Sequence, residues 1–208
     1  MLDLSLLPFI ATSLLIILTP GQDMVLVMSR SLSNGTRVGI TTAAGISSGL
    51  LLHTILAMLG VGTLLQASEW LFIILKLVGA IYLIYLGFKL FRSTDDLILV
   101  NNDRAPDSSF KIFLQGAFSN ISNPKIMLFY FAFLPQFVHP NSTNPMLSLF
   151  ILGATFAGIT FLVKGPIALL SGMLANRIRN NPYFLMYMYK VSGTVLFILG
   201  IKLALEHK

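Results

Sequence analysis

The sequence LTPGQDM, from Leu18 to Met24, interrupts the first long apolar run of this chain. Pro20 lacks the backbone N–H that a helix needs and clashes with the preceding turn, and Gly21 loosens that turn further. Asp23 adds a carboxylate, which costs about 2.5–3.5 kcal/mol at mid-membrane depth. A broken helix persists in a membrane only where its freed backbone groups face protein or a wet cavity. The stretch therefore predicts an interrupted helix that faces the interior of the molecule.

Composition places the chain among membrane proteins. Of its 208 residues, 55% are hydrophobic and only 11% are charged, and the mean hydropathy is +0.82. A soluble domain usually carries about 25% charged residues. We therefore expect an all-α integral membrane protein that forms a single transmembrane domain over residues 1–208 and has the lipid bilayer as its surroundings. The net charge of +6 does not indicate nucleic acid, because the basic residues gather where apolar runs end.

The residues that usually hold metals or cofactors are scarce. The chain has no cysteine, which excludes disulfides, thiolate metal sites and cysteine nucleophiles. Its histidines, His53, His139 and His207, are far apart and lack metal-ligand spacing. We expect neither a metal nor a cofactor. The N-terminal residues lack the basic start and cleavage site of a signal peptide, so we expect them to form the first membrane helix.

Six segments are long and apolar enough to span a membrane, which takes about 20 residues. With ends defined to about three residues, they are Leu4–Met28, Gly39–Leu64, Trp70–Phe91, Ile112–Phe137, Met146–Leu174 and Phe184–Leu205.

Basic residues predict the orientation of these segments. The connections after the first, third and fifth segments contain Lys and Arg, and those after the second and fourth contain none. Because cytoplasmic loops collect positive charge, connections 1, 3 and 5 are expected in the cytoplasm and both termini outside. Lys202 and Lys208, near the C-terminus, run against this pattern. The basic residues of the three connections are Arg30, Arg37, Lys89, Arg92, Arg104, Lys111, Arg177 and Arg179.

The two halves of the sequence resemble each other. KLVGAIYLIYLGFKL (Lys76–Leu90) and KVSGTVLFILGIKL (Lys190–Leu203) both read K-x-x-G, then an apolar run, then G-x-K-L. TPG at Thr19–Gly21 has a counterpart in NPK at Asn123–Lys125, since each puts a proline deep in a helix. Three helices per repeat is an odd number, so the second repeat enters from the opposite side. The sequence predicts six transmembrane helices in two inverted-topology three-helix repeats, over about residues 1–92 and 111–208 with a cytoplasmic linker at 93–110.

Helix breaks at matching places in two inverted halves indicate a substrate site. The candidate substrate-binding residues therefore surround the two prolines: Thr19, Pro20, Gly21, Gln22, Asp23, Asn123, Pro124 and Lys125. His53 and Lys164 are the other deep ionisable residues and are weaker candidates for the transport pathway.

Asp23 and Lys125 allow three interpretations. They form a salt bridge that joins the repeats; or Asp23 binds the ammonium and Lys125 the carboxylate of a zwitterion; or Asp23 carries the proton of a proton-coupled cycle. The N–H groups exposed at a broken helix would add to a carboxylate site. The sequence alone leaves all three open.

GISSG, Gly45 to Gly49, matches the G-x-S-x-G nucleophile motif of hydrolases. That motif needs a strand-to-helix turn, whereas this one lies within a membrane helix. An intramembrane protease would need Ser47 to reach His53, and a helix puts these residues about 240° apart around its axis. A small-residue packing face is the better interpretation, and a membrane-embedded hydrolase is disfavoured.

Three stretches together resemble the LysE/RhtB family of amino-acid exporters. They are TPGQDM with the following Ser29–Gly60, then KLVGAIYLIYLGFKLFRS, and then FLQGAFSNISNPKIMLFYFAFLPQF. The family usually opens with T-P-G-P-[DN]; Thr19, Pro20, Gly21 and Asp23 match this pattern, and Gln22 replaces the second proline. The second-half N-P-K matches as Asn123–Lys125.

The resemblance implies a small bacterial inner-membrane carrier that exports amino acids or their derivatives in exchange for protons. Family members export lysine, arginine, threonine, homoserine, leucine and cysteine-pathway metabolites. The alternative is an efflux carrier for another small solute or a cation. The sequence does not define the exported amino acid, and its glycine-rich helix faces would permit a homodimer.

Overall fold

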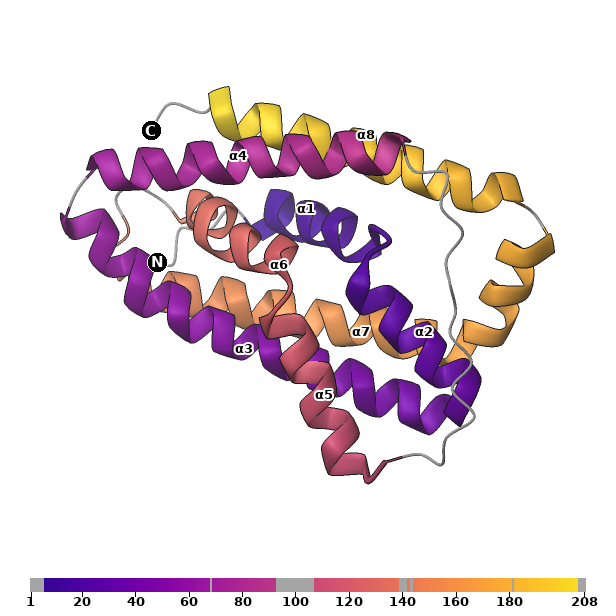
Figure 1. The fold of residues 1–208 in the computed structure, drawn as a ribbon. Helices are drawn as coiled ribbons and strands as arrows, with labels where there is room; N and C mark the ends of the chain where they lie inside the picture. The colour runs from indigo at the N-terminus through magenta and orange to yellow at the C-terminus, as the bar shows by residue number, and fades with distance from the viewer. Residues whose placement is uncertain are drawn as a thin grey trace.

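The computed structural model describes residues 6–67, 69–92, 107–138, 142, 144–180 and 182–205, and every element within these ranges is helical. Four long helices form two pairs, with shorter helices between and beside them (Figure 1). The long helices are α3 (Thr36–Ala67), α4 (Glu69–Arg92), α7 (Pro145–Asn180) and α8 (Pro182–Leu205). The shorter elements are α1 (Leu6–Leu18), α2 (Gln22–Asn34), α5 (Ser109–Ile121), α6 (Pro124–Leu128), the π-helix η1 (Phe129–Phe133) and the 3-10 helix η2 (Leu134–Phe137).

Within the described ranges, four helices are long and apolar enough to cross a membrane. The bent pair α1 and α2, which meet at 56°, makes a fifth if it counts as one span. The fourth expected segment, Ile112–Phe137, is instead divided among α5, α6, η1 and η2. The expected six spans are therefore not all present as helices of spanning length, because Asn123–Pro124 and a π-helical turn divide this segment.

The interruption expected at Thr19–Gly21 is present. Thr19 N–H donates to the Leu15 carbonyl and ends α1, and Pro20 has no N–H with which to continue the pattern. The backbone is fully extended at Gly21, whose carbonyl then accepts from the N–H groups of Met24 and Val25 as α2 begins. One apolar run thus becomes two half-helices.

The interruption expected at Asn123–Lys125 is also present, with a different local cause. Asn123 N–H donates to the Asn120 carbonyl as α5 ends. The Asn123 side chain then accepts from Lys125 N–H at 3.1 Å, which caps α6. Pro124 occupies the first turn of α6, where its missing N–H has no intrahelical partner to lose. Pro124 therefore starts a half-helix and does not kink a continuous one.

Helices α4 and α8 pack through the glycines of the repeated motif. A Cβ on Gly87 would lie 2.7 Å from the Gly193 carbonyl oxygen, and one on Gly193 would lie 2.6 Å from the Gly87 carbonyl oxygen. At the other end of the seam, a Cβ on Gly200 would lie 2.9 Å from the Ala80 carbonyl oxygen. The first glycine of one motif thus meets the second glycine of the other, and the two helices run antiparallel.

Helix α3 packs on α5 and α7 through small residues. Gly45 and Gly49, the ends of the GISSG motif, lie against the α5 backbone near Phe113 and Ala117. On α7, Gly153 lies against the Thr54 side chain. The packing interpretation of GISSG is therefore confirmed, because these two glycines make room for the backbone of a neighbouring helix.

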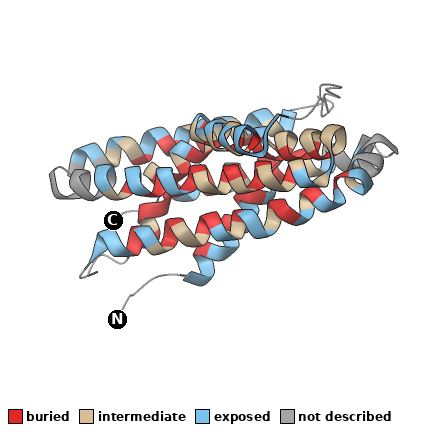
Figure 2. Cartoon of the chain, turned by 90° about the horizontal axis from the view of Figure 1, so that it is seen from below, coloured by how far each residue is buried: buried red, intermediate tan, exposed pale blue. Residues whose placement is uncertain are grey.

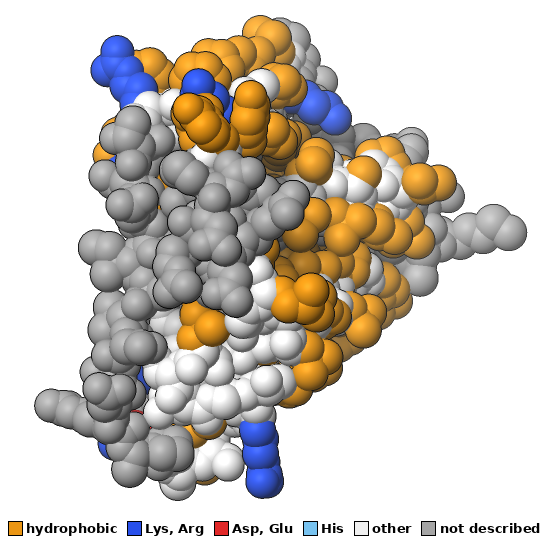
Figure 3. All heavy atoms as spheres, turned by 90° about the vertical axis from the view of Figure 1, so that its right-hand side faces the viewer, with side chains coloured by type: hydrophobic (Ala, Val, Ile, Leu, Met, Phe, Trp, Pro, Cys, Tyr) orange, Lys and Arg blue, Asp and Glu red, His pale blue; other side chains and the backbone are white. Residues whose placement is uncertain are grey.

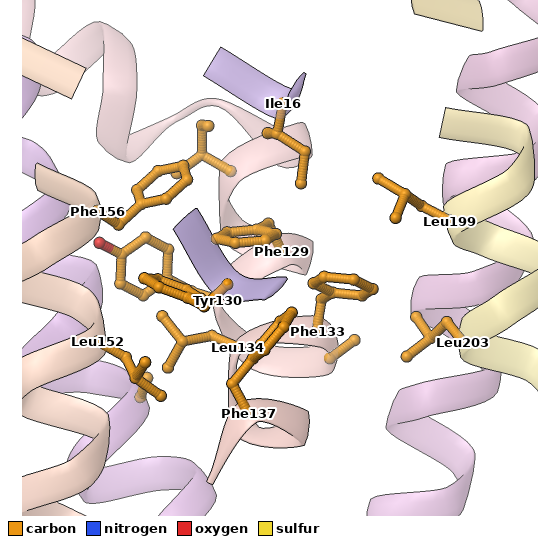
Figure 4. Close-up of a cluster of buried hydrophobic side chains, with 14 of the residues drawn as sticks. Ile16, Phe129, Tyr130, Phe133, Leu134, Phe137, Leu152, Phe156, Leu199 and Leu203 are labelled. Atoms are coloured by element: carbon orange, nitrogen blue, oxygen red, sulfur yellow. The ribbon is translucent and has the colours of Figure 1, made fainter. Parts of the chain in front are cut away.

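An aromatic cluster fills the core between these helices (Figure 4). The Phe129 ring lies 4.6 Å from the Phe156 ring and 5.5 Å from the Phe133 ring, centroid to centroid. Ile16 of α1 joins the same cluster. Buried side chains follow the inward faces of the helices and exposed ones the outward faces (Figure 2). The outward faces are strongly apolar, as a lipid-facing surface requires.

We expect Gly87→Ala to destabilise the fold, because its Cβ would meet the α8 backbone, which cannot move aside like a flexible side chain. Overpacking of this kind costs about 1–3 kcal/mol. Thermal unfolding of the purified protein in detergent measures the effect. The control is Gly172→Ala, at a helical glycine of α7 with open space around it. Equal unfolding temperatures for the two variants would contradict close packing of α4 against α8.

Candidate functional site

Asp23 lies at the start of α2 and is only 6% exposed. Its carboxylate accepts hydrogen bonds from the Asn120 side-chain amide at 2.8 Å and from the Asn123 side-chain amide at 3.3 Å. Both donors belong to the second helix break, at the end of α5. A buried carboxylate needs such donors to replace water. The acidic residue of the first break is thus held by the second break.

Lys125 makes the reciprocal connection. Its ammonium donates to the Ile16 carbonyl and to the Thr19 carbonyl, each at 3.4 Å. Ile16 lies four residues before Pro20, so its carbonyl is the one that loses a helical hydrogen bond to the proline. Within the described residues, Asp23 and Lys125 are not joined by a salt bridge. Each of these two ionisable residues therefore makes its hydrogen bonds with groups of the other helix break.

A narrow cavity lies between Asp23 and these half-helices. Its polar lining includes Thr19, Asp23, Asn120, Lys125, Thr160 and Lys164. The remaining wall is mainly apolar and includes Ile17, Leu50 and Phe156. The volume that water can reach is about 10 Å³, which is room for about one water molecule. A molecule larger than water therefore enters only if the half-helices or the lining side chains move.

Several polar groups of this cavity lack an internal partner. The Asn120 side-chain carbonyl oxygen and the Thr160 hydroxyl are buried and make no hydrogen bond. Lys164, which is 4% exposed, lies four residues after Thr160 on α7 and therefore on the same helix face. Buried polar groups are nearly always paired. These groups are therefore available to a ligand.

A wider pocket adjoins the other side of the breaks. Gly21 and Lys125 line both the cavity and this pocket, whose walls also include Tyr82, Lys89 and Tyr189. The volume that water can reach here is about 400 Å³. Gly21 lies directly beside the Lys125 side chain, since a Cβ on Gly21 would be in van der Waals contact with the Lys125 ammonium at 3.4 Å. The Lys125 side chain thus separates a wide pocket from a narrow cavity.

All eight predicted site residues come together at these two spaces. Thr19, Gly21, Asp23 and Lys125 line the cavity. The pocket is lined by Pro20, Gly21, Gln22, Asn123, Pro124 and Lys125.

Of the two weaker candidates, Lys164 lines the cavity and His53 does not. The His53 ring lies against α5, and its Nε2 is 3.3 Å from the Asn120 carbonyl oxygen. The ring also packs on Tyr130 at 5.5 Å, and its Nδ1 is buried without a hydrogen bond. His53 is therefore next to the helix break and can position Asn120, but it does not face the cavity.

Sequence reasoning missed Asn120 and Thr160. Asn120 precedes the predicted NPK break by one turn, and this spacing was the available signal. Thr160 precedes Lys164 by four residues, which places a hydroxyl next to an ammonium on a helix face. A single threonine in an apolar helix is common enough that only the structure distinguishes it.

A polar seam joins α2 to α5 beside the pocket. The Gln22 side-chain amide donates to the Ser119 hydroxyl at 3.0 Å, and Arg30 donates to the Gln115 side chain at 2.6 Å. Beyond the membrane helices, Asp107 accepts from Lys111 at 2.9 Å, and this hydrogen bond lowers the pKa of the Asp107 carboxyl. Basic side chains are exposed at this end of the molecule (Figure 3).

These features define a multi-pass membrane protein with an internal polar site at two helix breaks. The chain belongs to the family of LysE type translocators, whose family model matches residues 14–207. Members of this family are transporters, so the expectations of a transporter and of this family are confirmed.

Curated relatives agree over nearly the whole chain. An uncharacterised membrane protein of Bacillus subtilis, YrhP, is 34% identical and covers 97% of this chain and 99% of its own length. The homoserine/homoserine lactone efflux protein of Salmonella typhimurium is 32% identical, with 94% of both chains covered. The leucine efflux protein of Klebsiella pneumoniae is 32% identical over 84% of this chain and 82% of its own length. No solved structure gives a significant match.

We expect Asp23→Asn and Asn120→Ala to be strongly coupled in stability. Asn120→Ala alone removes a donor from a buried carboxylate, which costs about 1.5–3 kcal/mol. Once Asp23 is neutral, the same change matters much less, so a double-mutant cycle gives a coupling of about 0.5–3 kcal/mol. Thermal unfolding of the four proteins in detergent measures it. Additive effects would show that the charge of Asp23 adds nothing to the 2.8 Å contact.

Proposed function

We propose that this protein exports amino acids or their derivatives across the bacterial inner membrane, with the substrate site at the breaks between α1 and α2 and between α5 and α6. Two relatives of known function are efflux proteins for homoserine, its lactone and leucine. The observation that supports this site is that each helix break is hydrogen-bonded by the other. Asn120 donates to Asp23 of the first break, and Lys125 of the second break donates to the freed Ile16 carbonyl.

A zwitterionic amino acid suits this arrangement chemically. An ammonium group can pair with Asp23, and a carboxylate can pair with the lysine side of the cavity, which Lys125 and Lys164 line. Both contacts pair a buried charge with an opposite one, which lowers the cost of placing charges inside a membrane. The occupied site then provides partners for polar groups that the empty cavity leaves without one.

The inverted-repeat topology completes the proposal. Six membrane crossings result if α1–α2 and α5–η2 each cross once as broken spans. Antiparallel contact of the matching glycines Gly87 and Gly193 supports a two-fold relation between α4 and α8. Exposed basic side chains at the α2 and α4 C-terminal end support a cytoplasmic position for connections 1, 3 and 5. The pocket beside Lys89 then opens toward the cytoplasm, where export begins.

Asp23 is the group that we propose carries the coupled proton. It is the carboxylate of the cavity lining. It is buried at membrane depth, where gaining or losing one charge changes the free energy of the site strongly. Protonation weakens its attraction for an ammonium, so a proton arriving from outside would release the amino acid there. Return of the empty, protonated carrier would deliver that proton to the cytoplasm.

We expect Asp23→Asn to abolish coupled efflux. Cells that lack the protein and cells that overproduce it are loaded with a panel of dipeptides, and free amino acids are followed in the medium. Overproduction of the wild-type protein should speed the release of one class of amino acid, and a protonophore should suppress that effect. Asp23→Asn and Lys125→Ala should both reduce release to the level of cells without the protein.

Asn34→Ala is the control for these variants, since Asn34 is on α2 but lines neither the cavity nor the pocket. It should release amino acids like the wild type. Normal efflux by both Asp23→Asn and Lys125→Ala would disprove the proposed site. Absence of amino-acid release with the wild-type protein present in the membrane would disprove the proposed function.

A further inference from the structure

We propose that Lys164 and Thr160 of α7 bind the carboxylate of the transported molecule, that Asp23 and Asn120 bind its ammonium group, and that the substrate is an α-amino acid with an uncharged side chain. This inference rests on the proposed export function and assigns its recognition chemistry. It gives Lys125 a different role, as the residue that caps the broken helix.

Available donors lie on one wall of the cavity. Lys125 already donates to the Ile16 and Thr19 carbonyls. Lys164 lines the same cavity, is almost fully buried and makes neither a hydrogen bond nor a salt bridge within the described residues. The Thr160 hydroxyl, one helical turn away, is buried without a partner. An ammonium and a hydroxyl on one helix face form a receptor for a carboxylate.

Available acceptors lie on the opposing elements. Asp23 of α2 provides a carboxylate, and the Asn120 side-chain oxygen of α5 is buried without a partner. Because the Asn120 amide already donates to Asp23, its free oxygen is held next to that carboxylate. A carboxylate and an amide oxygen side by side can both accept hydrogen bonds from one ammonium group. The two half-sites therefore have opposite polarity across one cavity, as the main-chain groups of an amino acid require.

The charges of the cavity exclude a basic side chain. Lys125 and Lys164 repel each other, and Asp23 attracts both. With the Lys125 ammonium bound to two carbonyl oxygens, Asp23 and Lys164 balance the two charges of a zwitterion. The lining contains no second carboxylate to balance a cationic side chain. Ile17, Leu50 and Phe156 form an apolar wall that suits an aliphatic side chain.

Substrate analogues separate this assignment from a structural role. Purified wild-type protein and variants in proteoliposomes exchange radiolabelled leucine or homoserine, with unlabelled competitors added outside. The competitors are leucine, homoserine, their amides, which lack the carboxylate, and lysine. We expect the wild type to prefer each amino acid to its amide by at least about tenfold, since removing one partner of a buried ionic contact costs at least 1.4 kcal/mol. Lysine should compete at least about tenfold more weakly than leucine.

Lys164→Gln should bring the preference for amino acid over amide close to one, with affinity for the amide unchanged. Lys125→Gln is the matched control, since it removes the other lysine that lines the same cavity. It should lower transport and leave the preference in place. Thr160→Val keeps every charge and should reduce the preference about two- to tenfold, the effect of one hydrogen bond. Where a variant does not transport, its stabilisation by leucine and by leucinamide in a thermal-unfolding assay gives the same ratio.

The outcomes distinguish this inference from the proposed function. If the wild type exchanges no amino acid and is stabilised by none, both the proposed function and this inference are wrong. If it exchanges leucine or homoserine but Lys164→Gln keeps the preference, only the carboxylate assignment is wrong. If Lys125→Gln is the variant that loses the preference, the two lysines have the opposite roles. Equal competition by lysine would overturn the assignment of an uncharged side chain.

Discussion

The contact between the Lys125 ammonium and the carbonyls of Ile16 and Thr19 is the interaction on which the site depends. Pro20 breaks α1 and leaves a carbonyl without its helical partner in a place where lipid offers none. The partner comes from the other half of the chain, from the residue that follows Pro124. In return, Asn120 and Asn123 of the second half hold the carboxylate that follows the first break. Each break thus receives from the other the hydrogen-bonding partners that lipid cannot supply.

This reciprocity could be predicted only in part from the sequence. Prolines beside ionisable residues in two apolar runs were enough to locate both breaks and all eight candidate residues. The repeated K-x-x-G and G-x-K-L pattern indicated that the third and sixth segments correspond, and the structure packs these helices together through Gly87 and Gly193. Such features can be recognised in the sequence because proline, glycine and charged residues destabilise a membrane helix. Each one is therefore a strong signal.

The partners of these residues could not be predicted. The sequence left open a salt bridge between Asp23 and Lys125, whereas the structure pairs Asp23 with amides and Lys125 with carbonyls. Choosing between these pairings requires the rotation of α5 about its axis, which is set by the fit of Gly45 and Gly49 against its backbone. The sequence predicted the break at Pro124 but did not predict that the Ile112–Phe137 segment is divided again after it. There, bulky aromatic residues from Phe129 onward pack into the core as a π-helical turn, and no apolar period in the sequence indicates such a turn.

The same contacts explain how a site can be closed when empty and still bind a charged molecule. Asn120, Asn123 and the freed carbonyls are neutral, so they stabilise Asp23 and Lys125 by dipoles and do not cancel their charges. An arriving ammonium offers Asp23 a full opposite charge in addition to the amide dipoles, and this adds Coulombic attraction to the hydrogen bonds of the carboxylate. Under the proposed function, substrate can therefore join this network without breaking an ion pair, whereas it would have to compete with a direct salt bridge between Asp23 and Lys125. Because the network joins α1 and α2 to α5 and α6, we expect a substrate that enters it to shift the contacts that keep the cavity closed. In the proposed function, one set of hydrogen bonds thus links binding and the movement of the half-helices.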